Sequence, residues 1–178
     1  MPLDVFLLLD RDIVGVQIPS ESELHEDLGK GYAIELKGYH FGIKNSTTIG
    51  TASGGAGAGK ASFEQLIVTK QVDQLSPALM GVCAMGGHFK EAKLILRKPS
   101  SSKASSGGMY STFTLRMVAV SGVQWTTSNV DDVAEEHVTL SFGAMQIEYR
   151  AQDKTGRLST NPVVAAWSTS RNSDTLEV

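Results

Sequence analysis

Three long runs of alternating apolar residues, two of which change phase at a glycine, constrain the fold of this chain most strongly. Alternation with a period of two is typical of β-strands with one buried face. The apolar phase changes at Lys37-Gly38 and again at Gly143-Ala144, where a glycine permits a β-bulge that bends a strand. The runs are Tyr32–Ile43, Met109–Thr126 and Glu135–Arg150.

Shorter strands and one helix complete the predicted secondary structure. Ser76 is a suitable N-cap, Pro77 suits the first helical turn, and Gly86-Gly87 ends the apolar helical pattern. Many long, bent strands with a single helix predict a mainly β fold, a closed barrel or sandwich of two antiparallel sheets with one short α-helix packed at the side. The shorter strands are expected at Asp4–Leu9, Ser62–Lys70, Phe89–Lys98 and Val163–Ser170.

The length of 178 residues suits a single domain with a sizeable core, spanning residues 1–178. Long loops are expected at about residues 14–30, 44–61 and 99–108, because these stretches are polar or rich in glycine and serine. The tail 172–178 is polar and is expected to fray.

Charge and hydropathy exclude several classes of function. A net charge of −3 argues against a nucleic-acid-binding surface. The apolar run Val5–Leu9 is too short to insert into a membrane, and no basic lead precedes it, so it is not a signal peptide. We therefore expect synthesis in the cytoplasm and no cleaved signal. The single cysteine, Cys83, excludes an intrachain disulfide.

A glycine-rich segment resembles a phosphate-binding loop in its spacing but not in its context. Gly54, Gly55, Gly57 and Gly59 precede Lys60, in the pattern of glycine, four residues, glycine and lysine. The next residue is alanine, so the hydroxyl that would hold magnesium is missing, and the following stretch predicts a strand instead of a helix. A flexible loop is the favoured interpretation, and nucleotide binding that is lost in Lys60→Ala would support the NTPase alternative.

Titratable residues form no catalytic constellation. The four histidines include no close pair and no cysteine at metal-ligand spacing, so we expect no metal, no cofactor and no enzymatic activity. The densest acidic cluster is Asp131, Asp132, Glu135 and Glu136. A solvated turn is favoured over a carboxylate pair or cation site, because the spacing lacks the ligands of a calcium loop.

Apolar side chains on both sides of some predicted strands leave two interpretations open. Val5 and Leu7 lie in a strand that is apolar on both faces, and Val118 and Val120 lie on the outward phase of a long strand. These four residues are candidates for a subunit interface. The alternative is that the helix and loops of the same chain cover them.

Taken in order, several blocks make the chain resemble the haemolysin-coregulated protein (Hcp) family, the inner-tube proteins of bacterial type VI secretion systems. No single short motif carries the resemblance; the order and spacing of the blocks do. They are Met1–Leu7, Ile34–Leu36, Tyr39–Gly42, Ala58–Lys60, Leu66–Asp73, Ser76–Leu79, Gly87–Lys98, Val138–Phe142 and Ile147–Tyr149.

The resemblance implies a structural tube subunit. Family members form hexameric rings that stack into a tube, work with sheath, spike and baseplate proteins, carry effectors in the lumen and leave the cell through the type VI apparatus. It also implies a role in ring stacking for the glycine loop that ends at Lys60. A monomeric ligand-binding β-barrel is the alternative function.

His40 departs from the family, in which many members carry a small polar residue on the sheet that faces the lumen. Because histidine titrates near neutrality, His40 predicts mildly pH-dependent cargo binding.

Overall fold

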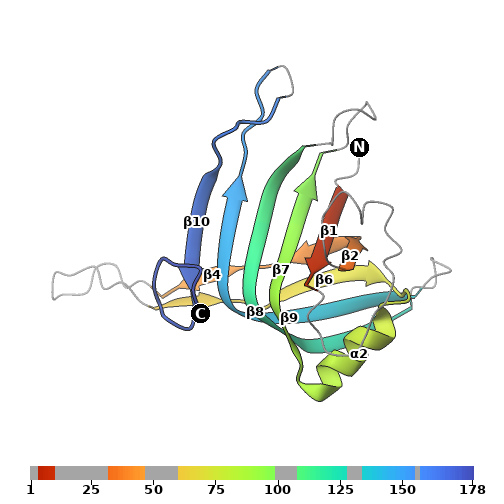
Figure 1. Cartoon of the computed structure of the whole chain (residues 1–178). Helices are drawn as coiled ribbons and strands as arrows, with labels where there is room; N and C mark the ends of the chain where they lie inside the picture. Colours follow the sequence, from red (N-terminus) through yellow and green to blue (C-terminus); the bar gives the residue numbers. More distant parts are fainter. Residues whose placement is uncertain (1–3, 11–31, 47–59, 99–107, 128–133, 155–156) are drawn as a thin grey trace.

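The computed structural model of the chain describes residues 4–10, 32–46, 60–98, 108–127, 134–154 and 157–178. Its strands curl into a nearly closed barrel with one short helix at the side (Figure 1). Among these residues, one eight-stranded sheet has the order β2-β1-β7-β8-β9-β6-β3 with β10 added to β9, and β4 pairs with β5 separately. The predicted mainly β, barrel-like fold is confirmed. The elements are β1 (Asp4–Leu9), β2 (Tyr32–Leu36), β3 (Gly38–His40), β4 (Ile43–Asn45), β5 (Ala61–Phe63), β6 (Leu66–Gln71), α2 (Ser76–Met85), β7 (His88–Arg97), β8 (Met109–Thr126), β9 (Glu135–Tyr149) and β10 (Val163–Ser168).

The strands β2 and β3 together form one bent strand that closes the barrel. β2 pairs antiparallel with β1, whereas β3 pairs antiparallel with β6 on the other side of the sheet. Between them, the N–H of Lys37 donates to the carbonyl oxygen of Thr69 at 2.8 Å. The chain thus changes its partner strand at Lys37-Gly38, which confirms the bend predicted there.

The long strands β8 and β9 pair along most of their length and carry the curvature of the barrel (Figure 1). The register between them shifts at Val120/Gly122 in β8, not at Gly143-Ala144 in β9. Met117, which falls opposite Gly143, has a φ of 52°. A positive φ is uncommon for a residue with a side chain, so the ladder is irregular here too. The register shift thus lies opposite Thr139 and not at Gly143-Ala144, so the bulge predicted at Gly143-Ala144 was wrong.

Aliphatic side chains fill the barrel and form one core. On the opposite face of the sheet, Phe6 of β1 and Ile95 of β7 are neighbours in the ladder, and both are also buried. β1 is thus buried on both faces, which explains why its sequence is apolar on both sides. The core includes Leu9, Ile34, Leu36, Leu66, Val68, Leu79, Val82, Phe89, Leu94, Leu115, Val138 and Leu140.

The helix α2 closes part of the barrel. Leu79 and Val82 face the core and are buried, as the sequence pattern predicted. Gly86 ends the helix in the left-handed region with a φ of 67°, and its N–H donates to Cys83 O at 3.3 Å. The N-cap prediction was wrong by one residue, because Leu75 occupies that position and makes no capping bond through its side chain.

The last ten residues, Thr169–Val178, fold back along the sheet and are called the C-terminal hook below. The Ser168 N–H donates to Ser173 O at 2.8 Å, and the Ser173 N–H donates to Ser168 O at 3.4 Å. The Arg171 guanidinium donates to Val178 O at 3.4 Å. The expectation of a frayed tail was therefore wrong, because backbone and side-chain bonds hold this polar segment.

Candidate assembly interface

β10 lies at one side of the barrel and pairs with β9 only; among the described residues no strand pairs with its other edge (Figure 1). Just after β10, the Thr169 N–H donates to Gly143 O at 2.8 Å, which fixes the alternation of hydrogen bonds in this ladder. In an antiparallel ladder, the N–H and C=O groups of every second residue bond to one neighbouring strand, and those of the residues between them point to the opposite side. The N–H and C=O groups of Val164 and Ala166 therefore point away from β9. Such an edge is a template for another strand.

Apolar and aromatic side chains flank this free edge. Val163 is 73% exposed and Val164 is 49% exposed. Opposite Val163, Tyr149 is also exposed, and its ring meets that of Tyr110 edge-on with centroids 6.2 Å apart. Burial, followed by the effect of Tyr39 and Tyr149, raises the pKa of Tyr110, so its phenol stays neutral. Val163 and Val164 point to opposite faces of β10, so exposed apolar side chains lie on both sides of the open edge, and such an edge is a candidate interaction site.

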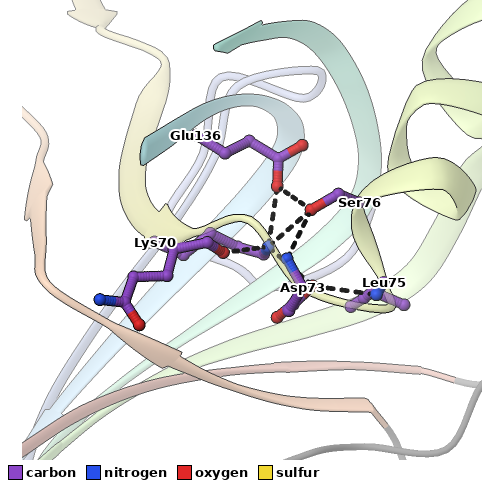
Figure 2. Close-up of polar contacts among 6 residues, drawn as sticks. Lys70, Asp73, Leu75, Ser76 and Glu136 are labelled. Atoms are coloured by element: carbon purple, nitrogen blue, oxygen red, sulfur yellow. Dashed lines mark hydrogen bonds and ion pairs between the residues drawn. The ribbon is translucent and has the colours of Figure 1, made fainter. Parts of the chain in front are cut away.

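A second group of polar side chains is buried at the start of α2 (Figure 2). The Lys70 ammonium lies 2.8 Å from Glu136 Oε2 and 2.8 Å from Asp73 Oδ1, and it donates to Gln71 O at 2.7 Å. It also donates to the Ser76 hydroxyl at 3.1 Å, and Ser76 Oγ donates to Glu136 Oε2 at 2.7 Å. These contacts, called the buried ion network, join β6, β9 and the first residue of α2.

The network occupies positions that would otherwise be apolar. Lys70 follows Leu66 and Val68 in the core phase of β6, and it is 1% exposed. Glu136 is 0% exposed, and its Oε1 has no hydrogen-bond partner. Because these groups are closed off from solvent, they are placed to fix α2 against the barrel and not to meet a substrate.

In the described residues, no group of three His, Cys, Asp or Glu side chains is arranged to hold a metal ion. No helix in the same residues is long and apolar enough to cross a membrane.

Comparison with known proteins shows to which family the chain belongs. The model of the type VI secretion system effector family Hcp matches residues 21–149. The chain belongs to the Hcp family. Protein hcp1 of Pseudomonas aeruginosa is 34% identical over 113 residues, which make up 64% of this chain and 68% of that protein.

Solved structures agree with this assignment. The fold is similar to that of a type six secretion system protein, with a TM-score of 0.81, 24% identity, and coverage of 98% of this chain and 100% of the other. It is also similar to Hcp1 from Salmonella typhimurium, with a TM-score of 0.69, 25% identity and the same coverage. Hcp proteins are tube components that are secreted by the type VI system. This chain is therefore a tube protein of the type VI secretion system, and its family is one of structural proteins.

The four residues expected at an Hcp subunit interface lie in the core of their own chain. Val5 is 6% exposed, Leu7 1%, Val118 0% and Val120 3%. All four belong to the single core cluster. Their side chains therefore have no free surface for a second subunit, and the interpretation that the same chain covers them is the one that fits.

Of the glycine loop, only Lys60 lies within the described residues. Gly54, Gly55, Gly57 and Gly59 fall outside them. Lys60 is exposed and directly precedes β5, so a strand follows the lysine where a phosphate-binding loop would need a helix. A role of this loop in stacking stays a prediction.

His40 lies on β3 with a side chain that is 73% exposed. Its Nε2 is 3.5 Å from Glu64 Oε2, and the Lys44 ammonium is 2.5 Å from Glu64 Oε1. The hydrogen bond from Lys44 and its charge lower the pKa of Glu64, with a smaller effect of His40 in the same direction and desolvation opposing both. His40 is thus part of an exposed cluster around an ionised carboxylate.

The acidic cluster divides between different environments. Asp131 and Asp132 fall outside the described residues. Glu135 bonds to the Lys37 ammonium at 2.8 Å, and this contact lowers its pKa, first through the hydrogen bond and then through the charge. Glu136 is buried, so the interpretation of the whole cluster as a solvated turn was wrong for this residue.

Sequence reasoning missed both the free edge of β10 and the buried ion network. A signal for the first was Pro162 directly before a short strand of small and branched residues. A signal for the second was the phase of Lys70 and Glu136, each of which continues an alternating series of core residues.

Proposed function

We propose that copies of this Hcp chain join into hexameric rings through the free edge of β10, that the rings stack into the inner tube, and that the lumen carries effectors. The observation that carries the ring proposal is that the outward backbone groups of Val164 and Ala166 have no partner among the described residues and lie beside exposed apolar side chains. A ring closed by rotation needs a heterologous contact, in which two different surfaces meet. An edge strand supplies one of these surfaces.

The remaining roles follow from the family. We propose that the tube acts with sheath, spike and baseplate proteins, and that the protein is made in the bacterial cytoplasm and leaves through the type VI apparatus without a cleaved signal. The function needs no cofactor, because positioning and stacking involve no chemical step.

Negative-stain electron microscopy of the purified protein tests the ring. Uniform six-membered rings with an open centre are the expected result. Compact particles without a hole, together with a monomeric mass, would favour the ligand-binding barrel instead.

Substitution of Val164 by proline is expected to abolish ring formation while leaving the subunit folded. Proline lacks the N–H that Val164 presents to the open edge, and it is tolerated on a strand where that N–H faces solvent. The control is Val164→Ala, which trims the side chain but keeps the donor and should form rings. Sedimentation and circular dichroism separate loss of assembly from loss of fold, and intact rings of Val164→Pro would exclude this edge as the contact.

Deletion of Gly54–Gly59 is expected to leave single rings intact and to block their stacking into tubes. A glycine loop reorders with little steric cost but loses backbone entropy when it does so, which suits a contact made only between rings. Microscopy at high protein concentration checks this result. Tubes of normal length from the deletion variant would count against a stacking role.

A further inference from the structure

The free edge of β10 is short because a different feature closes it at each end. The outward-pointing positions of this ladder are the even-numbered ones, as the Thr169 bond to β9 shows. Ser168 is such a position, but its N–H and C=O are already bonded to Ser173. At the other end, Pro162 falls at an even position and has no N–H to offer. Of the outward positions, only Val164 and Ala166 keep both their N–H and their C=O free of partners within the described part of the chain.

The closure at Ser168 is firmly held by the C-terminal hook. Thr169 Oγ1 donates to Gly143 O at 2.8 Å and to Phe142 O at 3.2 Å. The Arg171 guanidinium donates to Glu177 Oε2 at 3.0 Å, which ties the start of the hook to its end.

The end of the hook depends on the absence of a side chain in β9. A Cβ at Gly143 would lie 2.7 Å from Val178 Cγ1, a distance that would force one of them to move. The hook is therefore seated on β9 as well as on β10.

From this geometry we infer that the β10 edge is a slot for one short strand of a second copy of this chain, and that Pro162 and the hook fix its register. The inference rests on the proposed ring. A slip by one residue would turn the partner strand's side chains to the wrong face. A slip by two residues would need a donor where Pro162 has none or where the Ser168 donor is already used. The chain thus excludes the nearest alternative pairings, which limits open-ended association of an exposed edge.

Amide hydrogen exchange on rings and on diluted, separated subunits tests the slot. In the wild type, the Val164 and Ala166 amides should exchange rapidly in subunits and at least about tenfold more slowly in rings, a factor equivalent to roughly 1.4 kcal/mol. The Ser168 amide should be slow in both states, because the hook already bonds it.

Two variants open the slot from opposite ends. After deletion of residues 172–178, the Ser168 amide should become fast in subunits and slow in rings, because the partner strand now reaches it. Native mass spectrometry should also show a larger share of assemblies that are not hexamers. The Pro162→Ala variant leaves the hook intact and should give the same heterogeneity, which guards against a deletion that merely destabilises the fold.

The outcomes separate this inference from the ring proposal. Wild-type rings in which the Val164 and Ala166 amides exchange as in subunits would overturn the slot and leave the ring standing. If both variants gave uniform hexamers, and the Ser168 amide of the deletion variant exchanged rapidly in its rings, Pro162 and the C-terminal hook would have no role in fixing the register. A wild-type protein that forms no rings would remove both proposals.

Discussion

Replacement of Lys70 by methionine is expected to lower the free energy of unfolding by about 3–5 kcal/mol, because it leaves a buried carboxylate without its cation. Glu136 is 0% exposed and already has one oxygen without a partner. After the substitution, the Ser76 hydroxyl would be its one remaining partner among the contacts of the buried ion network. A loss of this size is a large part of the roughly 5–15 kcal/mol that stabilises a typical domain. Urea denaturation of separated subunits measures it.

Two control variants make this prediction specific. Lys37→Met breaks the ion pair with Glu135, which adjoins Glu136 in sequence but is partly exposed, and it should cost no more than about 1 kcal/mol. The double variant Lys70→Met/Glu136→Leu removes both buried charges and should recover most of the loss, since a buried pair contributes little relative to apolar residues of similar volume. Equal effects of Lys70→Met and Lys37→Met would show that burial of the network does not matter to stability.

Replacement of Leu7 by alanine is expected to cost about 2–5 kcal/mol in the separated subunit, the range for truncation of a buried leucine. Leu7 is 1% exposed and lies between Ile34 of β2 and Leu94 of β7, both of which are core residues. The loss combines the transfer of apolar surface with the cavity that remains. Thermal and urea unfolding at a concentration below that of assembly measure it.

The next residue of the same strand supplies a matched control. Leu8 points to the opposite face of β1 and is only half-buried, so Leu8→Ala should cost less than Leu7→Ala. Because the unfolding free energy is measured on separated subunits, a loss of stability in Leu7→Ala reports on the core of one chain and not on a subunit interface. A Leu7→Ala subunit that is as stable as the wild type but assembles poorly would return Leu7 to the interface.

The secondary structure was predictable where a local pattern specifies it. The alternation in Met109–Thr126 gave the bounds of β8, and Gly86 ended the helix because a left-handed residue is needed there. The bend at Lys37-Gly38 was also predictable, because apolar phase and glycine coincide at one point. At Gly143 they coincide too, yet the register shift lies in β8 between Val120 and Gly122, and Gly122 pairs with Thr139 instead of Gly143. A single sequence does not reveal at which point of a ladder, or on which of its two strands, an irregularity falls.

The candidate site was less predictable, because it depends on which surfaces the fold leaves open. The apolar residues of β1 suggested an interface, but β2, β7 and buried residues on the other face of the sheet cover that strand. Glu136 was assigned to a solvated turn from the charge of its neighbours, although its phase in β9 places it inside the barrel. We expected the C-terminal hook to fray because its sequence is polar. One of the groups that hold it, the Gly143 carbonyl, is distant in sequence, so the sequence alone did not indicate this contact.

The position of β9 in the sheet has a consequence for how a newly made chain folds. β9 is the strand to which β6, β8 and β10 all pair, and it is among the last to be synthesised. Until it leaves the ribosome, β6 and β3 pair with each other but with no other strand that the structure describes. At about 5–20 residues per second, β1 waits on the order of ten to thirty seconds for the strand that completes the barrel. Such distant pairings also fold slowly, so the nascent chain exposes its apolar β1 for longer than a helical protein of this size would. A chain interrupted before β9 is therefore expected to be more prone to aggregation than one that has just completed it.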